Sequence, residues 1–546
     1  MTDGGIISKY DLRGRLTART NGLNQTISYT YNEASDLTQI TGLNGNFVTL
    51  ERDPQGRLRL YGYGGYYLQF DYDEAGRPVR LINENGACAT FEYDVMDRLS
   101  KQVNFDGRTQ HYDFSAMGDI IRTEDEGLVS FYYYDKGGRL IRRKIGEGDQ
   151  APTEYFSYNE AGQLVKAWHT IIGSATFTTE FRLDKLGRIT QESQNIIDNK
   201  NESVWNYSVN REFDELGIES HTTYTGLPII TWQTYGSGHL HGVMLDDRSL
   251  VAFERDKRHR ETRREFGRTQ GVRTYDSLSR LLFQDIHSDL IDEKNSLKRQ
   301  HYYDVAGQLV RIETAKGVNE YCYDKSGRLI AVRQPGLLEQ SYRFDPAGNR
   351  LFESQTTITP NDHWEEAVRQ HMHDNSFNLL GSNGARDIHE TAFKWMDNRI
   401  KDDGEYHYEY DAWGNLRRKY KVEGNEEHRY NYDSNHRLMR YELESDTQVR
   451  GANYYYDTFG RRIAKQVQNA DSKGNLLGDI ETTFFGWDGD RLVLTEKDAH
   501  QIHTIYEPGS FVPMIRVAGE KAPPKRTLVQ QLQNYQGIVL DQKSRV

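Results

Sequence analysis

Apolar and polar residues alternate along much of this chain, most clearly in the stretch that ends at Asp73. Leu68, Phe70 and Tyr72 alternate with polar side chains, which is typical of a half-buried β-strand. The tetrapeptide Asp73–Gly76 then predicts a reversal, because Asp bonds forward to backbone amides and Gly accepts a positive φ. Arg77–Leu81 begins a return strand. The stretch is therefore predicted to be a β-hairpin.

This hairpin signature, Tyr-Asp-x-x-Gly-Arg-Leu, returns about every twenty residues. Its aspartate position falls at Asp11, Asn32, Asp53, Asp73, Asp94, Asp113, Asp135, Asn159, Asp184, Asp214, Asp276, Asp304, Asp324, Asp345, Asp411, Asp433 and Asp457, with Asp256 as a degenerate copy. Self-similarity at one period indicates a single supersecondary unit stacked many times. The sequence thus predicts an all-β fold, a β-solenoid of stacked hairpins.

The turns themselves are predicted to be structural. The expected structural repeat positions are Asp11 and Gly14, Asp73 and Gly76, Asp135 and Gly138, Asp324 and Gly327, Asp411 and Gly414, and Asp457 and Gly460. Arg or Asn usually follows the glycine, as at Arg15, Arg57, Arg77, Arg139, Arg188, Arg328, Asn349, Asn415 and Arg461. Because these residues recur at the same register, their side chains should stack into a ladder along the sheet. We expect them to stabilise the turns by pairing with the turn aspartates.

Composition agrees with strands and tight turns, since the chain has 36 Tyr and 48 Gly in 546 residues. Mean hydropathy is -0.82, which suits a thin wall with much wet surface. The net charge of -12 argues against nucleic acid as a partner. The basic stretch from Arg255 to Arg264 is the main exception, and we interpret it as a solvated edge.

The cysteines, the N-terminus and the lengths of the apolar runs bear on the compartment of the protein and on its export. Cys88 and Cys322 lie far apart and suit a reducing compartment without a disulfide framework. Residues 1–5 resemble no signal peptide, and no apolar run is long enough to span a membrane. We expect synthesis in the cytoplasm and export, if any, by a dedicated machine.

No segment offers a convincing catalytic constellation. His239 with His241, and His371 with His373, each supply two potential ligands, but two histidines do not complete a metal site. Nucleophile elbows, phosphate-binding glycine loops and zinc-protease motifs do not occur in the sequence. Residues 361–374 predict a short helix that interrupts the β pattern. We therefore expect no enzyme, no catalytic residue, no cofactor and no metal.

The repeat resembles the YD repeat of Rhs proteins, and the last third of the chain carries the more specific likeness. There, Tyr410-Asp411-Ala412-Trp413-Gly414-Asn415, Tyr456-Asp457-Thr458-Phe459-Gly460-Arg461, Trp487-Asp488-Gly489-Asp490-Arg491-Leu492 and Tyr506-Glu507-Pro508-Gly509-Ser510-Phe511-Val512-Pro513 follow in an order similar to the end of an Rhs core. The resemblance covers about residues 10–516. It implies a β-sheet wound into a hollow shell or cage, as in toxin-complex components and teneurins, and in Rhs effectors a shell around a toxin.

The C-terminus departs from that family pattern. An Rhs core continues into more repeats and a Gly-rich autoproteolytic Asp-Pro-x-Gly segment, whereas residues 517–546 contain neither. Asp53-Pro54 and Asp345-Pro346 occupy ordinary repeat turns. We expect a shell over 1–516, with insertions near 215–275 and 350–400, and a tail over 517–546. The chain is then a fragment of a longer effector, a truncated gene product, or a shell that works with a partner chain.

Three functional hypotheses remain open. The first is the structural cage of an Rhs-type toxin, which encloses or escorts a toxin polypeptide for delivery to competitor or host cells. Its partners would be the toxin cargo and a type VI secretion spike or an adaptor or chaperone. The second is a cell-surface or secreted recognition or adhesion protein that uses the outer face of the shell. The third is an enzyme within the insertions.

Overall fold

The computed structural model describes residues 6–520, except 44, 172–174, 237, 289–296, 325, 338–339, 352–396 and 472–474. All regular elements of these residues are β-strands, and no helix occurs among them. The predicted all-β class and the stacking of hairpins are therefore confirmed. The predicted helix at 361–374 lies outside the described residues. The described residues also contain no helix long and apolar enough to cross a membrane.

The chain divides into two compact units, which we call unit 1 (Met1–Thr109 and Val251–Gly404) and unit 2 (Gln110–Leu250 and Glu405–Val546). In each unit, we call the N-terminal segment the first passage and the C-terminal segment the second passage.

The strands of unit 1 belong to two segments of the chain. They are β1 (Ile7–Tyr10), β2 (Leu16–Thr20), β3 (Thr26–Tyr31), β4 (Leu37–Thr41), β5 (Phe47–Arg52), β6 (Leu58–Tyr63), β7 (Tyr66–Tyr72), β8 (Pro78–Ile82), β9 (Cys88–Tyr93), β10 (Leu99–Val103), β23 (Arg248–Arg255), β24 (Glu261–Phe266), β25 (Thr269–Tyr275), β26 (Leu281–Ser288), β27 (Leu297–Tyr303), β28 (Leu309–Thr314), β29 (Gly317–Tyr323), β30 (Leu329–Arg333), β31 (Gln340–Ser341), β32 (Arg343–Phe344) and β33 (Arg350–Leu351).

Unit 2 is built in the same way from its own two segments. Its strands are β11 (Thr109–Phe114), β12 (Ile120–Asp125), β13 (Leu128–Tyr134), β14 (Leu140–Ile145), β15 (Thr153–Tyr158), β16 (Leu164–Thr170), β17 (Ala175–Leu183), β18 (Ile189–Asp198), β19 (Ser203–Phe213), β20 (Glu219–Tyr224), β21 (Ile230–Tyr235), β22 (His239–Leu245), β34 (Tyr406–Tyr410), β35 (Leu416–Lys421), β36 (Glu427–Tyr432), β37 (Leu438–Glu444), β38 (Gln448–Tyr456), β39 (Arg462–Asp471), β40 (Leu476–Asp488), β41 (Arg491–Lys497), β42 (His500–Tyr506) and β43 (Pro513–Glu520).

Consecutive strands within a unit pair antiparallel as hairpins, and the motif turns share one irregularity. The register shifts between Asp71 and Tyr72 in the β7–β8 pair, and between Tyr133 and Tyr134 in the β13–β14 pair. The shift is a β-bulge, which bends the strand and re-aims the next side chain. It falls on the tyrosine that precedes the turn aspartate, and so gives that tyrosine the same placement from hairpin to hairpin.

Burial along the strands follows the alternation seen in the sequence. In β7, Leu68, Phe70 and Tyr72 are half-buried, whereas Gln69 and Asp71 are exposed. Few side chains of the first hairpins are fully buried, because a wall one sheet thick leaves both faces near solvent.

The stretch from 215 to 275, where the sequence predicts inserted loops, is occupied mainly by β20 to β25. Some of its connections reverse the chain without the Asp-x-x-Gly motif. The β24–β25 hairpin turns through Gly267, at φ +55°, with Phe266 paired to Thr269. At the C-terminal end, β43 continues to Glu520, past the expected boundary at 516.

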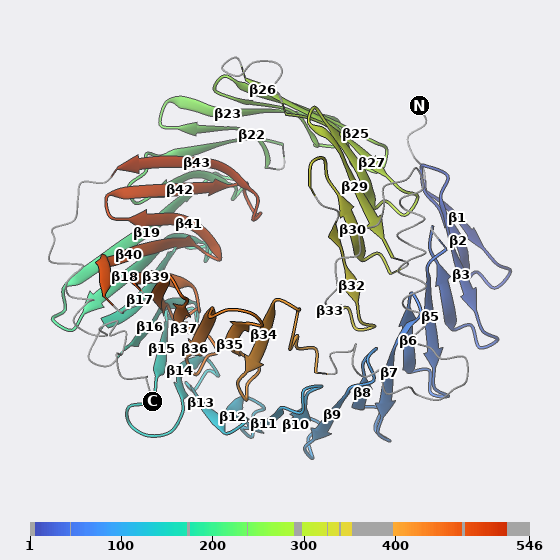
Figure 1. Cartoon of the computed structure of the whole chain (residues 1–546), viewed down its shortest axis with the longest axis horizontal. Helices are drawn as coiled ribbons and strands as arrows, with labels where there is room; N and C mark the ends of the chain where they lie inside the picture. Colours follow the sequence, from blue (N-terminus) through green and yellow to red (C-terminus); the bar gives the residue numbers. More distant parts are fainter. Residues whose placement is uncertain are drawn as a thin grey trace. The chain divides into compact units, whose positions relative to one another are not determined.

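The largest buried core lies in unit 2, where β39 and β40 pack against β17, β18 and β19 (Figure 1). The rings of Trp205 on β19 and Phe484 on β40 stack with centroids 5.6 Å apart. Tyr207 is 1% exposed and contacts Gly486, where a Cβ would approach the Tyr207 ring to 2.7 Å. Two passages of the chain therefore share this core. Unit 1 has a smaller cluster of Cys322, Ile330 and Ala331, with Phe344 packed against it.

Candidate functional site: the motif turns and the buried seam of unit 2

The motif turn has the same hydrogen bonds from one copy to the next. In the copy at Asp73, the Gly76 amide donates to the Asp73 carbonyl at 3.0 Å, and the Asp73 amide donates to the Arg77 carbonyl at 3.0 Å. One carboxylate oxygen of Asp73 accepts the Arg77 amide at 2.9 Å, and the other accepts the Arg77 Nε at 2.7 Å. Aspartate and arginine thus close the turn from both sides.

The glycines predicted as structural positions all have a positive φ. The values are +76° at Gly14, +87° at Gly76, +76° at Gly138, +78° at Gly327, +85° at Gly414 and +80° at Gly460. Their aspartates Asp11, Asp73, Asp135, Asp324, Asp411 and Asp457 each accept the closing amide of the turn. Glycine is not obligatory, because Ser35, Asp97 and His436 hold the same position at φ +72°, +63° and +60°.

Two aspartate positions assigned from the sequence change in the structure. Asp113 lies on β11 and does not open a turn; Ser115 does, and its hydroxyl accepts the Met117 and Asp119 amides at 3.1 Å. A serine hydroxyl replaces the carboxylate there, which hid the turn from a search for aspartate. Conversely, Asp256 forms a complete turn with Arg260, at 2.7 Å between its carboxylate and the Arg260 Nε.

Sequence reasoning missed the role of the motif tyrosine, which joins consecutive hairpins. The Tyr158 hydroxyl donates to the Leu140 carbonyl at 2.8 Å, and the Arg139 guanidinium lies 5.3 Å from the Tyr158 ring centroid. Arg139 also donates to its own Asp135 at 2.6 Å and to the Asn159 carbonyl of the next turn at 3.5 Å. We call this set of contacts the clamp.

The clamp recurs with little change in both units. Tyr hydroxyls donate to the carbonyl that follows the motif Arg at 2.8 Å for Tyr31, 2.7 Å for Tyr72, 2.8 Å for Tyr275 and 2.8 Å for Tyr456. The matching arginines Arg15, Arg57, Arg260 and Arg437 lie over those rings at 4.8, 4.7, 4.9 and 5.4 Å. The regular spacing of Tyr, Asp and Arg was the signal that could have revealed it.

Hydrogen bonding favours the ionised form of the half-buried turn aspartates Asp11 and Asp94. The pKa of Asp94 lies below its usual range, because the Arg98 side chain and the Arg98 and Met96 amides all donate to its carboxylate. The pKa of Asp11 is lowered mainly by the Arg15 amide, and further by the Arg15 side chain. Carboxylates held as anions by their own arginines are poor proton donors, so these turns are not suited to acid–base catalysis.

In unit 2, one motif turn is deeply buried and forms an ion network. The network links Asp457 and Arg461 of the second passage to Glu192 of the first, and all three are at most 8% exposed. Arg461 Nε donates to Asp457 at 2.7 Å, and Nη1 donates to Glu192 at 2.6 Å and to the Gly489 carbonyl at 2.6 Å. Burial opposes the charge of Arg461, but Asp457 and Glu192 outweigh it and raise its pKa.

Further contacts extend this buried seam across unit 2. Gln194 donates to the Trp487 carbonyl at 2.8 Å and accepts the Trp487 amide at 3.1 Å, as a strand would. Asp488, which is 2% exposed, pairs with Arg211 and with Arg491. The seam therefore fastens two passages whose sequences lie hundreds of residues apart.

Unit 1 has its own, smaller contacts between passages. Asn85 Nδ2 donates to the Asp345 carboxylate at 2.7 Å, and the Ala347 amide donates to Asn85 Oδ1 at 3.2 Å. Arg328 Nη2 donates to the Tyr66 hydroxyl at 3.0 Å. Here too, motif turns of the second passage meet the first passage.

The other residues singled out in the sequence lie apart from these contacts. His239 and His241 are on β22, where the His239 ring is tilted and the His241 ring is edge-on to the Tyr235 ring; His371 and His373 lie outside the described residues. In the basic stretch, Arg264 pairs with Glu261 at 2.7 Å and Arg263 with Glu265 at 2.7 Å. Within the described ranges, no group of three His, Cys, Asp or Glu side chains is placed to hold a metal.

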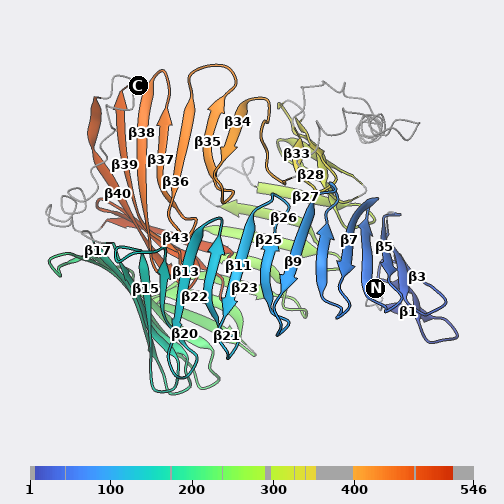
Figure 2. The same cartoon turned by 90° about the horizontal axis from the view of Figure 1, so that it is seen from below.

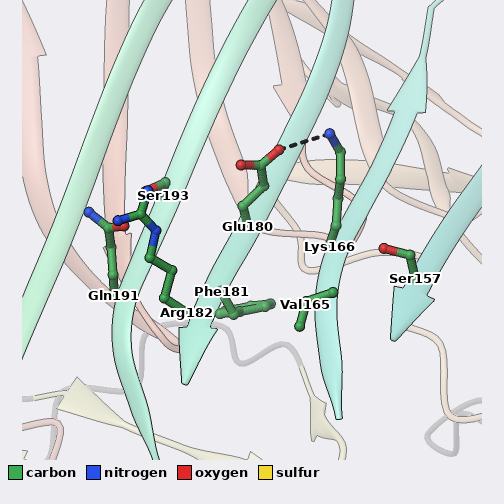
Figure 3. A pocket seen from close by; sticks show the side chains of 8 residues that line it. All are labelled: Ser157, Val165, Lys166, Glu180, Phe181, Arg182, Gln191 and Ser193. Carbon is green, nitrogen blue, oxygen red and sulfur yellow. Dashed lines mark ion pairs between the residues drawn. The ribbon is translucent and has the colours of Figure 1, made fainter. Parts of the chain in front are cut away.

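An open hollow of about 280 Å³ lies on β15 to β18 of unit 2 (Figure 3). Lys166 and Glu180 form an ion pair across it at 2.8 Å, and Ser157 and Ser193 continue the same row on neighbouring strands. Lys166 and Glu180 neutralise each other, and Arg182 is a further charged side chain of the lining. The described lining offers no nucleophile paired with a base.

Comparison with known proteins adds sequence relatives. The RHS Repeat family model matches residues 10–46 and 72–109. Toxin protein Tse5 of Pseudomonas aeruginosa is 33% identical over 411 residues, which cover 72% of this chain and 29% of that protein. Double-stranded DNA deaminase toxin A of Burkholderia cenocepacia is 27% identical over 554 residues, covering 93% of this chain and 35% of that protein. The chain thus spans about a third of these relatives.

Solved structures show the same fold. The Photorhabdus luminescens Tc holotoxin pore matches with a TM-score of 0.61 and 13% identity, over 94% of this chain and 29% of that one. The crystal structure of TcdB2-TccC3 matches with a TM-score of 0.56 and 13% identity, over 94% of this chain and 32% of that one. The fold is thus that of a repeat protein built from stacked β-hairpins. Together with the repeat match and the sequence relatives, it makes the chain an Rhs/YD-repeat protein.

Proposed function

We propose that this chain forms part of the wall of a shell. The shell would enclose or escort a toxin polypeptide for delivery to competitor or host cells. The observation that carries the proposal is the combination of YD hairpins along nearly the whole described chain with two relatives that are named as toxins. A type VI secretion spike, or an adaptor or chaperone, is the proposed delivery partner. Nucleic acid is not proposed as a partner, because the net charge is -12 and Arg263 and Arg264 of the basic stretch pair with Glu265 and Glu261.

The wall suits containment for a physical reason. Most hairpins bond to the next through backbone pairing, and many also through the clamp, so few strand edges are left within each sheet. Where the wall is one sheet thick, as in the first hairpins, both faces remain available and carry Tyr and charged side chains at alternating positions. Many weak polar and aromatic contacts of this kind hold a polypeptide without one dominant anchor.

We further propose a purely structural role. The turn aspartates and glycines, from Asp11 and Gly14 to Asp457 and Gly460, would maintain the wall and bind no ligand. The wall would extend to Glu520, where β43 ends, four residues past the boundary expected from the sequence, and the residues that follow would form the tail. The chain alone would then have no hydrolytic, nuclease or transferase activity, and turn aspartates such as Asp53, Asp135 and Asp457 are engaged by their own arginines.

Co-expression with a toxin polypeptide tests enclosure. The purified complex is treated with protease, and the lifetime of the cargo is compared with that of the cargo alone. We expect the cargo to survive until the wall is unfolded by denaturant, and then to be digested quickly. An unrelated soluble protein, co-expressed in the same way, is the control and should gain no protection. Cargo that is digested equally fast with and without the chain would contradict enclosure.

A further inference from the structure

One face of β38 to β41 in unit 2 carries a row of paired side chains, and Figure 2 shows β38, β39 and β40 side by side. Tyr454 of β38 is paired with Lys465 of β39. Lys465 is in turn paired with Thr483 of β40, and Thr483 with Lys497 of β41. Residues directly opposite each other in antiparallel strands project to the same side of a sheet. Phe484, which follows Thr483, projects to the other side and stacks on a tryptophan of the first passage, so the row lies on the face away from the buried core.

Basic side chains gather on this face of the second passage. Arg450 precedes Tyr454 by four residues on β38 and therefore projects to the same side. The Arg462 guanidinium lies 5.6 Å from the Tyr454 ring centroid and 4.6 Å from the Phe485 ring centroid. The Lys465 ammonium lies 5.8 Å from the Tyr454 ring centroid. We call the following four residues the cationic face: Arg450, Arg462, Lys465 and Lys497.

The cations of this face outnumber the carboxylates that engage them. Glu481 of β40 pairs with Lys497 at 2.9 Å. Among the residues that the structure describes, no carboxylate forms an ion pair with Arg450, Arg462 or Lys465. Burial lowers the pKa of Lys465, and the neighbouring charges of Arg450, Arg462 and Lys497 lower it further. In a chain whose net charge is -12, these cations repel one another, and an anionic partner relieves that repulsion.

The dimensions of the cationic face favour an extended chain over a small ion. Neighbouring strands lie about 4.8 Å apart, so the row from β38 to β41 spans about 14 Å. A single carboxylate or phosphate does not bridge this distance, whereas about four extended residues do. Arg462 already lies over the rings of Tyr454 and Phe485, which are 9% and 6% exposed, so these rings are not free to stack on nucleobases. Carboxylates spaced along a polypeptide are therefore the ligand that fits.

We propose that the cationic face binds an acidic stretch of the enclosed toxin polypeptide. The carboxylates of the stretch pair with Arg450, Arg462 and Lys465. This inference rests on the proposed function, because the toxin supplies the acidic stretch. Charge pairs at an accessible surface contribute more to selectivity and to the rate of encounter than to affinity. The cationic face thus selects acidic segments, and the many weak contacts of the wall hold the rest of the polypeptide.

Fluorescence anisotropy of labelled peptides with the purified full chain tests this preference. The probe is a peptide of about ten residues in which glutamate alternates with alanine, which is long enough to cross the row. Matched peptides carry glutamine or lysine in place of glutamate. We expect the glutamate peptide to bind at least about tenfold more tightly than either, and its affinity to fall as salt is added, because salt screens exposed charges. Equal binding of the glutamate and glutamine peptides would overturn the proposal.

Two double variants locate the binding site. R450Q/K465Q removes two cations that have no carboxylate partner in the described chain and should weaken binding of the glutamate peptide about tenfold. K166Q/R429Q is the matched control, since it removes the same charge from unit 2 at cations that pair with glutamates at 2.8 and 2.6 Å. The control should bind like wild type, and circular dichroism melts that match wild type show that both variants fold. An equal loss in both variants would mean that overall charge alone governs binding, against the proposal.

Two further measurements separate this inference from its alternatives. Single-stranded oligothymidylate that binds more tightly than the glutamate peptide would assign the cationic face to nucleic acid and refute an acidic polypeptide. The protease assay of the enclosed cargo is scored independently. Cargo protection without charge-selective peptide binding would refute the role of the cationic face and leave enclosure standing. Peptide binding without cargo protection would refute enclosure, and with it the toxin as the occupant of this face.

Discussion

Arg461 is the residue whose replacement should harm unit 2 most. Its side chain is 8% exposed and bonds two carboxylates, Asp457 and Glu192, that are 2% and 1% exposed. Arg461→Met keeps most of the aliphatic volume but removes the charge. Glu192 then keeps only the Gln194 amide at 3.1 Å and the Gly489 amide at 3.1 Å as donors, with no cation beside it.

The cost follows from the burial of these groups. Removing one partner of a buried ion pair leaves an uncompensated charge and costs about 3–5 kcal/mol. Arg188 offers a matched comparison in the same unit, because it also donates to its turn aspartate, at 2.6 Å from Asp184, but is 31% exposed. An exposed pair contributes about 0–1 kcal/mol. Arg461→Met should therefore cost several times more than Arg188→Met.

Urea unfolding followed by tryptophan fluorescence measures the difference, since Trp487 and Trp205 lie in the affected core. Glu192→Gln in the Arg461→Met background provides a second test. It removes the unpaired charge and keeps hydrogen-bonding atoms, so it should recover about 1–2 kcal/mol. If Arg461→Met costs no more than Arg188→Met, or if Glu192→Gln adds to the damage, the interpretation of the seam as a charge network is wrong.

Three further predictions concern the clamp, the turns and acid. Tyr158→Phe removes the bond to the Leu140 carbonyl and should cost about 1 kcal/mol in urea unfolding, whereas Tyr133→Phe, on a ring 37% exposed, should change little. Gly138→Val at φ +76° should cost about 1–3 kcal/mol by thermal unfolding and Gly138→Asn clearly less; equal values would contradict backbone strain as the cause. Burial lowers the pKa of His503 from 6.5 to about 4, so the unfolded chain binds the proton more tightly. Its contribution is complete above about pH 6.5 and falls as pH drops toward 4, with a loss of about 2 kcal/mol between pH 7 and 5 that His503→Leu should abolish in urea titrations.

The hairpins could be predicted from the sequence because their signals are local. Alternation over Leu68, Phe70 and Tyr72, and the turn residues Asp73 and Gly76, lie within a few positions of one another. The stretch from 215 to 275 was harder, because several of its turns are built from glycine alone and lack the aspartate that marks a repeat.

The seam could not be predicted, because nothing local marks it. Glu192 and Arg461 look like other charged residues of strand and turn, and they meet only because two passages pack together. The turn at Ser115 was missed for a chemical reason, since a hydroxyl accepts the same amides as a carboxylate. The tyrosine of the motif was read as a strand residue, although its hydroxyl carries a specific bond to the preceding hairpin.

The clamp has a direction along the chain, and this has a consequence for synthesis. Each hairpin supplies the arginine and the carbonyl, and the hairpin that follows supplies the tyrosine. A hairpin emerging from the ribosome therefore stays unfastened until about twenty more residues have been made. The clamps therefore form in order from the N-terminal side, one hairpin behind synthesis. A pause in translation then leaves the newest hairpin without its clamp, whereas earlier hairpins such as those of Arg15 and Arg57 are already clamped.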